Sequence, residues 1–370
     1  MTRLPAWADY GLLPALNIAL AFLVTGVVVA IIGENPVEAL ATMVEGAFLF
    51  PGGIGYTLFY ATNFIFTGLA VAVAYQARLF NIGAEGQAAL GGIGAAAVAL
   101  SLDQVLPGLM VVPLAIAAAA AAGLAWAIVP GWLQAYRGSH IVITTIMFNT
   151  IAAGLTVTML AGALRDPRQP NPQTRQVEEA ARLPAIHDLA RDLGLEAATS
   201  PLTLAFPLAL LAAVLVWVLI FRTRWGYALR VMGQSEPAAV YAGIPVRRLT
   251  LGAMAVSGAL AGLMAVNVIL GDAGRLVINF TAGYGFTGIA VALMGRAHPV
   301  GVVLAALLFG ALFQGGTELD YVYRSISREM VLLIQGLIIL FCGALSLMLV
   351  PWVARALAAF RGPEDAEGRA

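Results

Sequence analysis

The stretch Phe80-Asn81-Ile82-Gly83-Ala84-Glu85-Gly86-Gln87 opens an apolar, glycine-rich run that continues to Leu100. The run is long enough to cross a bilayer, where a polar side chain is costly unless it meets water, a partner or a ligand. Glu85 is therefore a candidate functional residue, and Asn81 is expected to cap the start of the helix. The alternative is a packing seam, in which the glycines bring helices together and Glu85 points into the inner interface.

The composition of the whole chain agrees with a membrane location. Of its 370 residues 61% are hydrophobic and 11% are charged, and the mean hydropathy is +0.89. Such a chain has too little polar surface to cover a soluble globule. A membrane-crossing helix needs roughly 20 apolar residues, and about ten stretches of the sequence offer such a run, two of them short. We therefore predict an all-α, polytopic membrane protein with about ten transmembrane helices.

The predicted organisation is one transmembrane domain, residues 14–350, between cytoplasmic tails at 1–13 and 351–370. The domain contains an outer loop, 165–201, with a short helix near 177–193, and a cytoplasmic segment, 222–248. A second outer loop is expected at Gly315–Arg328. The predicted spans are 14–32, 54–75, 80–100, 109–129, 141–164, 202–221, 249–270, 284–294, 300–314 and 330–350. The eighth and ninth are short for a full crossing.

The distribution of arginine sets the expected orientation. All 20 basic residues are Arg, and with the N-terminus inside, the inner segments hold 12 of them. The outer segments hold eight, five of which lie in the long loop 165–201. Long loops count less toward the positive-inside rule. Both termini are therefore predicted to be cytoplasmic.

Several classes of site are excluded or unsupported. The absence of Lys excludes a P-loop ATPase, whose motif needs that residue. Cys342 is alone, so the chain can form neither a disulfide framework nor a Cys-based metal site. The three His residues make no ligand pair at helical spacing, and the zero net charge gives no sign of a nucleic-acid partner.

The sequence contains one short internal repeat. Phe66-Thr67-Gly68-Leu69-Ala70-Val71-Ala72 recurs as Phe286-Thr287-Gly288-Ile289-Ala290-Val291-Ala292, and each copy leads toward an arginine, Arg78 or Arg296. In the predicted topology both copies run from outside to inside, so they are expected to be parallel. Chance similarity among helices rich in Ala, Val and Gly is the alternative.

These motifs resemble the permease subunits of ATP-binding-cassette importers, in the branch that includes ribose, branched-chain amino acid and nucleoside importers. The resemblance covers roughly residues 15–350. Its most specific part is Thr67-Gly68-Leu69 followed by Leu79–Gly83 and Glu85-Gly86-Gln87, which is similar to the nucleoside and simple-sugar group. A second similar stretch is Gly283–Leu293, ending in Gly295-Arg296-Ala297-His298-Pro299.

The resemblance implies a permease that forms half of the translocation pathway for a nucleoside or simple sugar in a bacterial cytoplasmic (inner) membrane. It implies no enzymatic activity in this chain, since ATP and Mg²⁺ would be bound by a separate, double-cassette ATPase. The other implied partners are a second, related permease, a substrate-binding lipoprotein or periplasmic protein, and the lipid bilayer.

Two groups of residues are candidates for function. A sugar or nucleoside needs hydrogen-bond partners along an apolar conduit, and those on offer are Asn63, Thr67, Asn81, Glu85, Gln87, Asn149, Asn279 and Thr287. Contact with the ATPase is assigned to a short helix with candidate residues Ser235, Glu236, Val240, Tyr241 and Gly243.

In that helix Ser235 is the expected cap, and Val240 and Tyr241 are the bulky contact groups. The usual importer motif, Glu-Ala-Ala-x-x-x-Gly, is met only in part, because Pro237 stands where the Glu belongs. An ordinary positive-inside loop is the alternative.

A different class of function is a secondary transporter with Glu85 as a proton or sodium site. A membrane enzyme ranks third, because the sequence has no convergent set of catalytic residues. Dependence on a separate ATPase or on an ion gradient distinguishes the first two classes.

Overall fold

The structure is a computed structural model that describes residues 12–323, together with 5, 8, 325, 326, 328–340, 350, 351 and 353–355. Cys342 and most of the predicted tails 1–13 and 351–370 lie outside the described residues. Within them, all named elements are helical, and β-structure is limited to two isolated bridges. The predicted all-α class is confirmed.

Six described helices are long and apolar enough to cross a membrane, and each occupies a predicted span. They are α3 (Gly53–Gln76), α5 (Gly108–Arg137), α6 (Ile141–Ala161), α8 (Ala205–Arg222), α11 (Val246–Val266) with its π-helical extension to Ala273, and α13 (Pro299–Val322). The other four predicted stretches contain α1 (Leu13–Ile32), α4 (Ala84–Leu102), α12 (Tyr284–Met294) and α14 (Arg328–Ile339). Among these four, residues 22–32 of α1 and all of α12, residues 284–294, form apolar helices that are too short to be counted as full spans.

The prediction of a short ninth span followed by an outer loop at Gly315–Arg328 is wrong, because α13 continues to Val322. Its glycine pair does not end the helix but lets other segments approach it. A Cβ atom at Gly315 would lie 2.6 Å from the carbonyl oxygen of Met43, and one at Gly316 would lie 2.7 Å from Val331. The close contacts explain glycines within a helix, where they otherwise cost stability.

The helix expected near 177–193 is also corrected. The structure has a 3₁₀ turn at Glu179–Ala181 and then the short helix α7 (Ile186–Asp192). Pro184 lies between them and would remove a hydrogen bond from a continuous helix, because it has no N–H group.

The chain divides into two compact units, of which the smaller comprises residues 1–46 and 315–370. It contains α1, α2 (Pro36–Val44), the end of α13, and α14. Asn35 caps α2, since its side chain accepts a hydrogen bond from the Val37 N–H at 3.0 Å and donates one to Glu38 at 2.9 Å.

The larger unit, residues 47–314, is built around α4, α5 and α11. Glycines bring the backbones of these helices into direct contact. A Cβ atom at Gly262 of α11 would lie 2.3 Å from the Ala119 carbonyl oxygen of α5, and one at Gly91 of α4 would lie 2.5 Å from the Gly262 carbonyl oxygen. Small residues permit such approach between helices in lipid, where the hydrophobic effect does not drive their association.

The two copies of the internal repeat lie against each other, in α3 and α12. The ring of Tyr284 meets that of Phe64 at 5.7 Å, and the Gln76 side chain donates to the Ala297 carbonyl at 2.9 Å. Between these contacts, a Cβ atom at Gly288 would lie 2.4 Å from the Thr67 hydroxyl. Because residue numbers rise together along both helices, the copies are parallel, as predicted.

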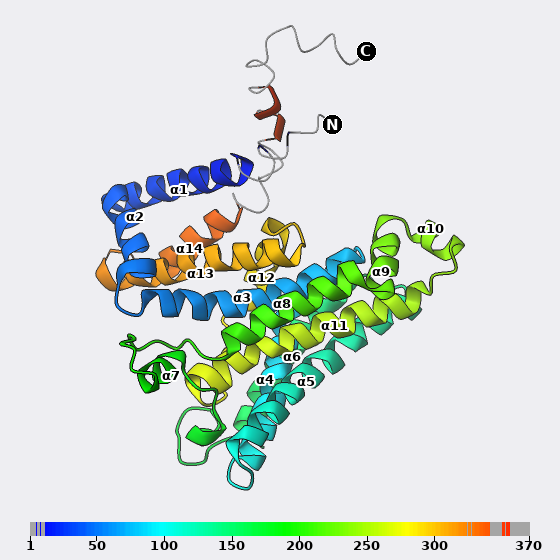
Figure 1. The fold of residues 1–370 in the computed structure, drawn as a ribbon, viewed down its shortest axis with the longest axis horizontal. Coiled ribbons are helices and arrows are strands. Elements are labelled where there is room, and N and C mark those ends of the chain that lie inside the picture. Colours follow the sequence, from blue (N-terminus) through cyan, green and yellow to red (C-terminus); the bar gives the residue numbers. More distant parts are fainter. Residues whose placement is uncertain are drawn as a thin grey trace. The chain divides into compact units, whose positions relative to one another are not determined.

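The loops of the larger unit gather at opposite ends of its helices. Figure 1 shows α7, within the segment 165–201, at one end, and α9 (Arg224–Gln234) with α10 (Glu236–Tyr241) at the other. The segments predicted as outer and cytoplasmic are thus separated by the length of the helices.

Gly262→Ala is expected to destabilise the larger unit by about 1–3 kcal/mol, because the added methyl group overpacks the contact with α5. The control is Gly154→Ala in α6, where a Cβ atom would meet nothing within 4 Å. Thermal unfolding of the detergent-solubilised chain measures both. Equal stability of the two variants would contradict the close contact.

Candidate functional site

The segment Leu79–Gly83 is a non-helical break in the chain between the end of α3 and the start of α4. Asn81 does not cap α4 as expected, because the helix begins at Ala84 with Gly83 as its N-cap. Instead, the Asn81 amide donates to the Ser257 hydroxyl at 2.8 Å and to the Gln87 side chain at 3.0 Å, and its oxygen accepts from the Gly83 N–H at 2.8 Å. Asn81, Gln87 and Ser257 are all buried. This network stabilises the break.

The break lies within the helical layer rather than at its edge. Ser257 of α11, which accepts from Asn81, donates to the Ala70 carbonyl of α3 at 2.6 Å. Ala70 precedes the last residue of α3, Gln76, by six positions, which is about 9 Å of helix. After the end of α3 the chain therefore runs back alongside its last turns, and α4 starts from there.

Glu85 joins the start of α4 to the start of α12. Its two carboxylate oxygens accept hydrogen bonds from the backbone N–H groups of Gly283, at 3.0 Å, and Gly285, at 2.7 Å. The approach requires glycine, since a Cβ atom at Gly285 would lie 2.3 Å from the Glu85 nitrogen. A helix N-terminus carries partial positive charge, so one carboxylate here stabilises two helix starts.

Asn149 of α6 also binds the backbone at the start of α4. Its amide oxygen accepts from the Gly86 N–H at 2.9 Å, and its amide nitrogen donates to the Ile82 carbonyl at 2.9 Å. The two bonds flank Glu85, so α6 holds the first turn of α4 in place.

A cavity of about 500 Å³ opens where α4, α6 and α12 meet. It includes three of the predicted path residues, Glu85, Asn149 and Asn279. The rest of its lining is Gly86, Ala89, Thr150, Ala153, Thr156, Val157, Ile278, Phe280, Thr281 and Phe286. Thr150, Thr281 and Phe286 were missed by the sequence reasoning. Phe286 belongs to the repeated heptapeptide, which was the one available signal.

The remaining predicted path residues lie outside this lining. Asn63 and Thr67 are buried in α3, where Asn63 accepts from the Asn267 amide at 2.9 Å and the Thr67 hydroxyl donates to the Asn63 carbonyl at 2.9 Å. Asn81 and Gln87 belong to the network at the break. The Thr287 hydroxyl donates to the Gly283 carbonyl at 3.3 Å.

The short helix at the opposite end from the segment 165–201 has the predicted form. Ser235 caps α10, accepting from the Ala238 N–H at 3.3 Å, and Gly243 follows the helix with φ at 73°. Val240 and Tyr241 are exposed, at 61% and 95%. Glu236 lies in the first turn. The helix thus presents an aromatic and an aliphatic side chain to its surroundings.

A second cavity, of about 990 Å³, lies beside α10. Its lining includes Arg78, Arg247 and Arg248, together with Ser235 and Val240. Nearby arginines stack on aromatic rings, with Arg247 over Tyr136 at 5.4 Å and Arg222 over Trp217 at 5.1 Å. This end of the unit is therefore basic and aromatic.

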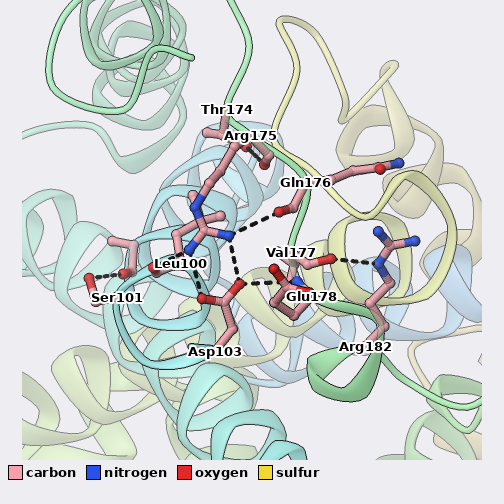
Figure 2. Close-up of polar contacts among 10 residues, drawn as sticks. Leu100, Ser101, Asp103, Thr174, Arg175, Gln176, Val177, Glu178 and Arg182 are labelled. Carbon is pink, nitrogen blue, oxygen red and sulfur yellow. Dashed lines mark hydrogen bonds and ion pairs between the residues drawn. The ribbon is translucent and has the colours of Figure 1, made fainter. Parts of the chain in front are cut away.

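The other end of α4 is held by a charge pair (Figure 2). Arg175, from the segment 165–201, binds Asp103 through two nitrogen–oxygen contacts of 2.6 and 2.8 Å and also donates to the Leu100 carbonyl at 2.7 Å. The Glu178 N–H donates to Asp103 as well, at 3.0 Å. The Asp103 side chain is fully buried, whereas that of Arg175 is 26% exposed.

These contacts determine the ionisation of Asp103. Burial alone would raise the pKa of this carboxyl, but the hydrogen bonds from Arg175 and Glu178 outweigh it. The pKa therefore lies below its usual value of 3.8. The carboxylate form, and with it the charge pair, is favoured.

The segment 165–201 also pairs with the chain that leads to the cavity. Thr174 donates from its N–H to the Leu276 carbonyl at 3.1 Å and accepts from the Leu276 N–H at 3.0 Å. The Val177 N–H donates to the Gly274 carbonyl at 2.8 Å. The lining residues Ile278–Thr281 follow directly along the chain.

Comparison with known proteins gives one family. Residues 53–343 match the family described as "Branched-chain amino acid transport system / permease component". The glucose ABC transporter permease protein TsgB13 of Haloferax volcanii is 34% identical, covering 91% of this chain and 88% of the relative. The guanosine ABC transporter permease protein NupP of Bacillus subtilis is 36% identical, covering 89% and 92%. The nucleoside ABC transporter permease protein NupB of Lactococcus lactis is 31% identical, covering 89% and 90%.

The Asp103 pair should make the stability of the larger unit pH-dependent. Since the folded pKa is lowered, the pair stabilises fully above the unfolded pKa near 3.8, and the contribution is lost as the pH falls through the lower folded value. Asp103→Asn is expected to cost about 1–3 kcal/mol at pH 7 and less at pH 3, which lies below the unfolded pKa of 3.8.

Unfolding of the detergent-solubilised chain as a function of pH measures this difference, with Asp192→Asn, an exposed change at the end of α7, as the control. A cost for Asp103→Asn that is the same at both pH values would contradict the assignment.

Proposed function

Because the chain belongs to the family of permease components of branched-chain amino acid transport systems, we propose that it forms half of the translocation pathway of an ATP-binding-cassette importer for a nucleoside or simple sugar. A permease of this family is a multi-pass membrane protein, and ATP hydrolysis takes place in a separate subunit. The observation that carries the proposal is the cavity within the helical layer, at the point where the starts of α4 and α12 meet.

The substrate class is supported by the relatives and by the chemistry of the cavity. Relatives with at least 31% identity are named for guanosine, nucleosides or glucose. Thr150, Asn279 and Thr281 give the cavity hydroxyl and amide groups among apolar side chains. Small-molecule sites typically combine apolar walls with a few polar groups that fix orientation.

Discontinuous helices that meet inside a bilayer are a known basis for transport sites. The Leu79–Gly83 break and the residues 274–283 before α12 provide such interruptions. Their backbone groups are satisfied by Asn81, Glu85 and Asn149, which is the condition for irregular chain at membrane depth.

We place about ten spans in the bacterial cytoplasmic (inner) membrane, with both termini in the cytoplasm. The arginine distribution supports this orientation. The rings that stack with Arg137 and Arg222, Trp132 and Trp217, lie at the end that carries α9 and α10. Tryptophan and tyrosine are enriched at the membrane–water interface, which is consistent with an inner boundary there.

The proposed assembly contains a second, related permease, a double-cassette ATPase that binds ATP and Mg²⁺, and a substrate-binding lipoprotein or periplasmic protein. The second permease is supported by two relatives in Bacillus subtilis, NupP and NupQ, both named guanosine ABC transporter permease proteins, at 36% and 27% identity. The exposed α10 is the proposed ATPase contact, since aromatic anchors typically carry the binding energy of such interfaces.

The geometry of Glu85 does not favour a secondary transporter. Both carboxylate oxygens already accept hydrogen bonds from backbone N–H groups, of Gly283 and Gly285, so little of the carboxylate is left to bind an ion. Glu85 is better explained as the anchor between α4 and α12.

Glu85→Gln should lower uptake but preserve membrane insertion and association with the ATPase. The amide oxygen can accept only one of the two N–H groups, and the amide nitrogen would face the other, a loss of about 1–3 kcal/mol at the start of α12. Uptake by cells and co-purification of the ATPase are the measurements.

Glu196→Gln, at an exposed position in the segment 165–201, is the control. Loss of insertion or assembly would indicate a packing role alone. Loss of uphill transport with downhill exchange retained would indicate an ion-coupled carrier instead.

Tyr241→Asp should break docking of the ATPase, because it removes the exposed aromatic ring of α10. Gly243→Pro should do the same, since proline cannot adopt the φ of 73° found there. The matched control is Tyr321→Asp, at a tyrosine that is 86% exposed in α13. Co-purification measures docking, and a pull-down with the substrate-binding protein tests the other face. Normal uptake with both α10 substitutions present would refute the coupling assignment.

A further inference from the structure

Three of the six polar side chains that line the 500 Å³ cavity already make hydrogen bonds within the protein. Glu85 accepts two backbone N–H groups, and the Asn149 amide uses both its oxygen and its nitrogen. The Thr156 hydroxyl donates to the Ala152 carbonyl at 2.8 Å. These three residues shape the cavity, and they offer a ligand little hydrogen-bonding capacity.

Three polar side chains of the lining remain available. Within the described residues, Thr150, Asn279 and Thr281 have no side-chain hydrogen-bond partner. Asn279 is exposed and has φ at 57°, a left-handed conformation that Asn tolerates better than most residues. Its amide can both donate and accept.

The most exposed large apolar side chain of the cavity lining is an aromatic ring. Phe286 lies in the first turn of α12 and is 49% exposed, whereas its neighbours Gly285 and Thr287 are buried. Its counterpart in the other copy of the heptapeptide, Phe66, is fully buried. The two copies therefore use the same residue type differently, one in the core and one on the cavity wall.

A flat ring beside one free amide and two hydroxyls suits a heterocyclic base better than a free sugar. A monosaccharide carries hydroxyls around its whole ring, and each one left without a partner in an apolar site costs affinity. A nucleobase has apolar faces that stack on aromatic side chains, and a polar edge that an amide can bind. On the basis of the proposed function, we infer that this cavity selects nucleosides over free sugars, through stacking on Phe286 and a base-edge contact to Asn279.

The test compares ATP-dependent uptake of labelled guanosine and glucose by proteoliposomes that contain the complex purified with this chain. Wild-type complex should take up guanosine in preference to glucose. Phe286→Ala should lower guanosine uptake roughly tenfold, as expected for a lost stacking contact. Phe286→Leu should behave similarly because it keeps the apolar volume without the ring, and Phe286→Trp should retain uptake.

Asn279→Gly removes the amide but keeps the left-handed backbone, since glycine adopts it freely, and should lower guanosine uptake several-fold. The matched control is Leu293→Ala, also in α12 and 38% exposed but outside the cavity lining, which should leave uptake unchanged.

The outcomes separate the inference from the proposed function. ATP-dependent uptake of glucose in preference to guanosine overturns the inference and leaves the importer intact. Full guanosine uptake by Phe286→Leu also overturns it, because the ring then acts only by its volume. Absence of ATP-dependent uptake of both compounds by wild-type complex, with the chain folded and the ATPase bound, overturns the proposed function together with the inference.

Discussion

The contact between the Glu85 carboxylate and the N–H groups of Gly283 and Gly285 is the constraint on which the inner part of the larger unit depends. A break between helices leaves backbone N–H and C=O groups without intrahelical partners. At these breaks one charge stabilises the starts of α4 and α12, and the Asn81 and Asn149 side chains satisfy the groups around them. The cavity is the space that this arrangement leaves open.

Hydropathy was sufficient to predict the class of fold and the approximate positions of the helices, because a bilayer demands long apolar runs. Three of the path residues predicted from the sequence, Glu85, Asn149 and Asn279, line the cavity; Glu85 and Asn149 were conspicuous as polar groups in apolar runs. Pattern alone could not separate these from Asn63, Asn81 and Gln87, because a buried hydrogen bond and a cavity wall both require polar residues. Only the hydrogen-bond partners seen in the structure distinguish a buried polar residue from one on the cavity wall.

For apolar residues, the sequence could not distinguish a core position from a position on the cavity wall. Phe66 and Phe286 occur in nearly identical sequence, yet one is in the core and the other on the cavity wall. The glycine pair at 315 and 316 was misread as a loop for a similar reason. Glycine ends helices and also permits close helix contacts, and the choice depends on Met43 and Val331, which are distant in sequence.

The attachment of α4 at both ends has a mechanical consequence. Asp103 ties its last residues to Arg175, and Glu85 ties its first turn to α12, while glycine contacts along its length hold it against α5 and α11. The segment 165–201 is also paired with residues 274–276, a few positions before the cavity lining. A displacement of that segment would therefore pull on the cavity wall or break one of these bonds, so the hydrogen bonds link one end of the helices to the cavity between them.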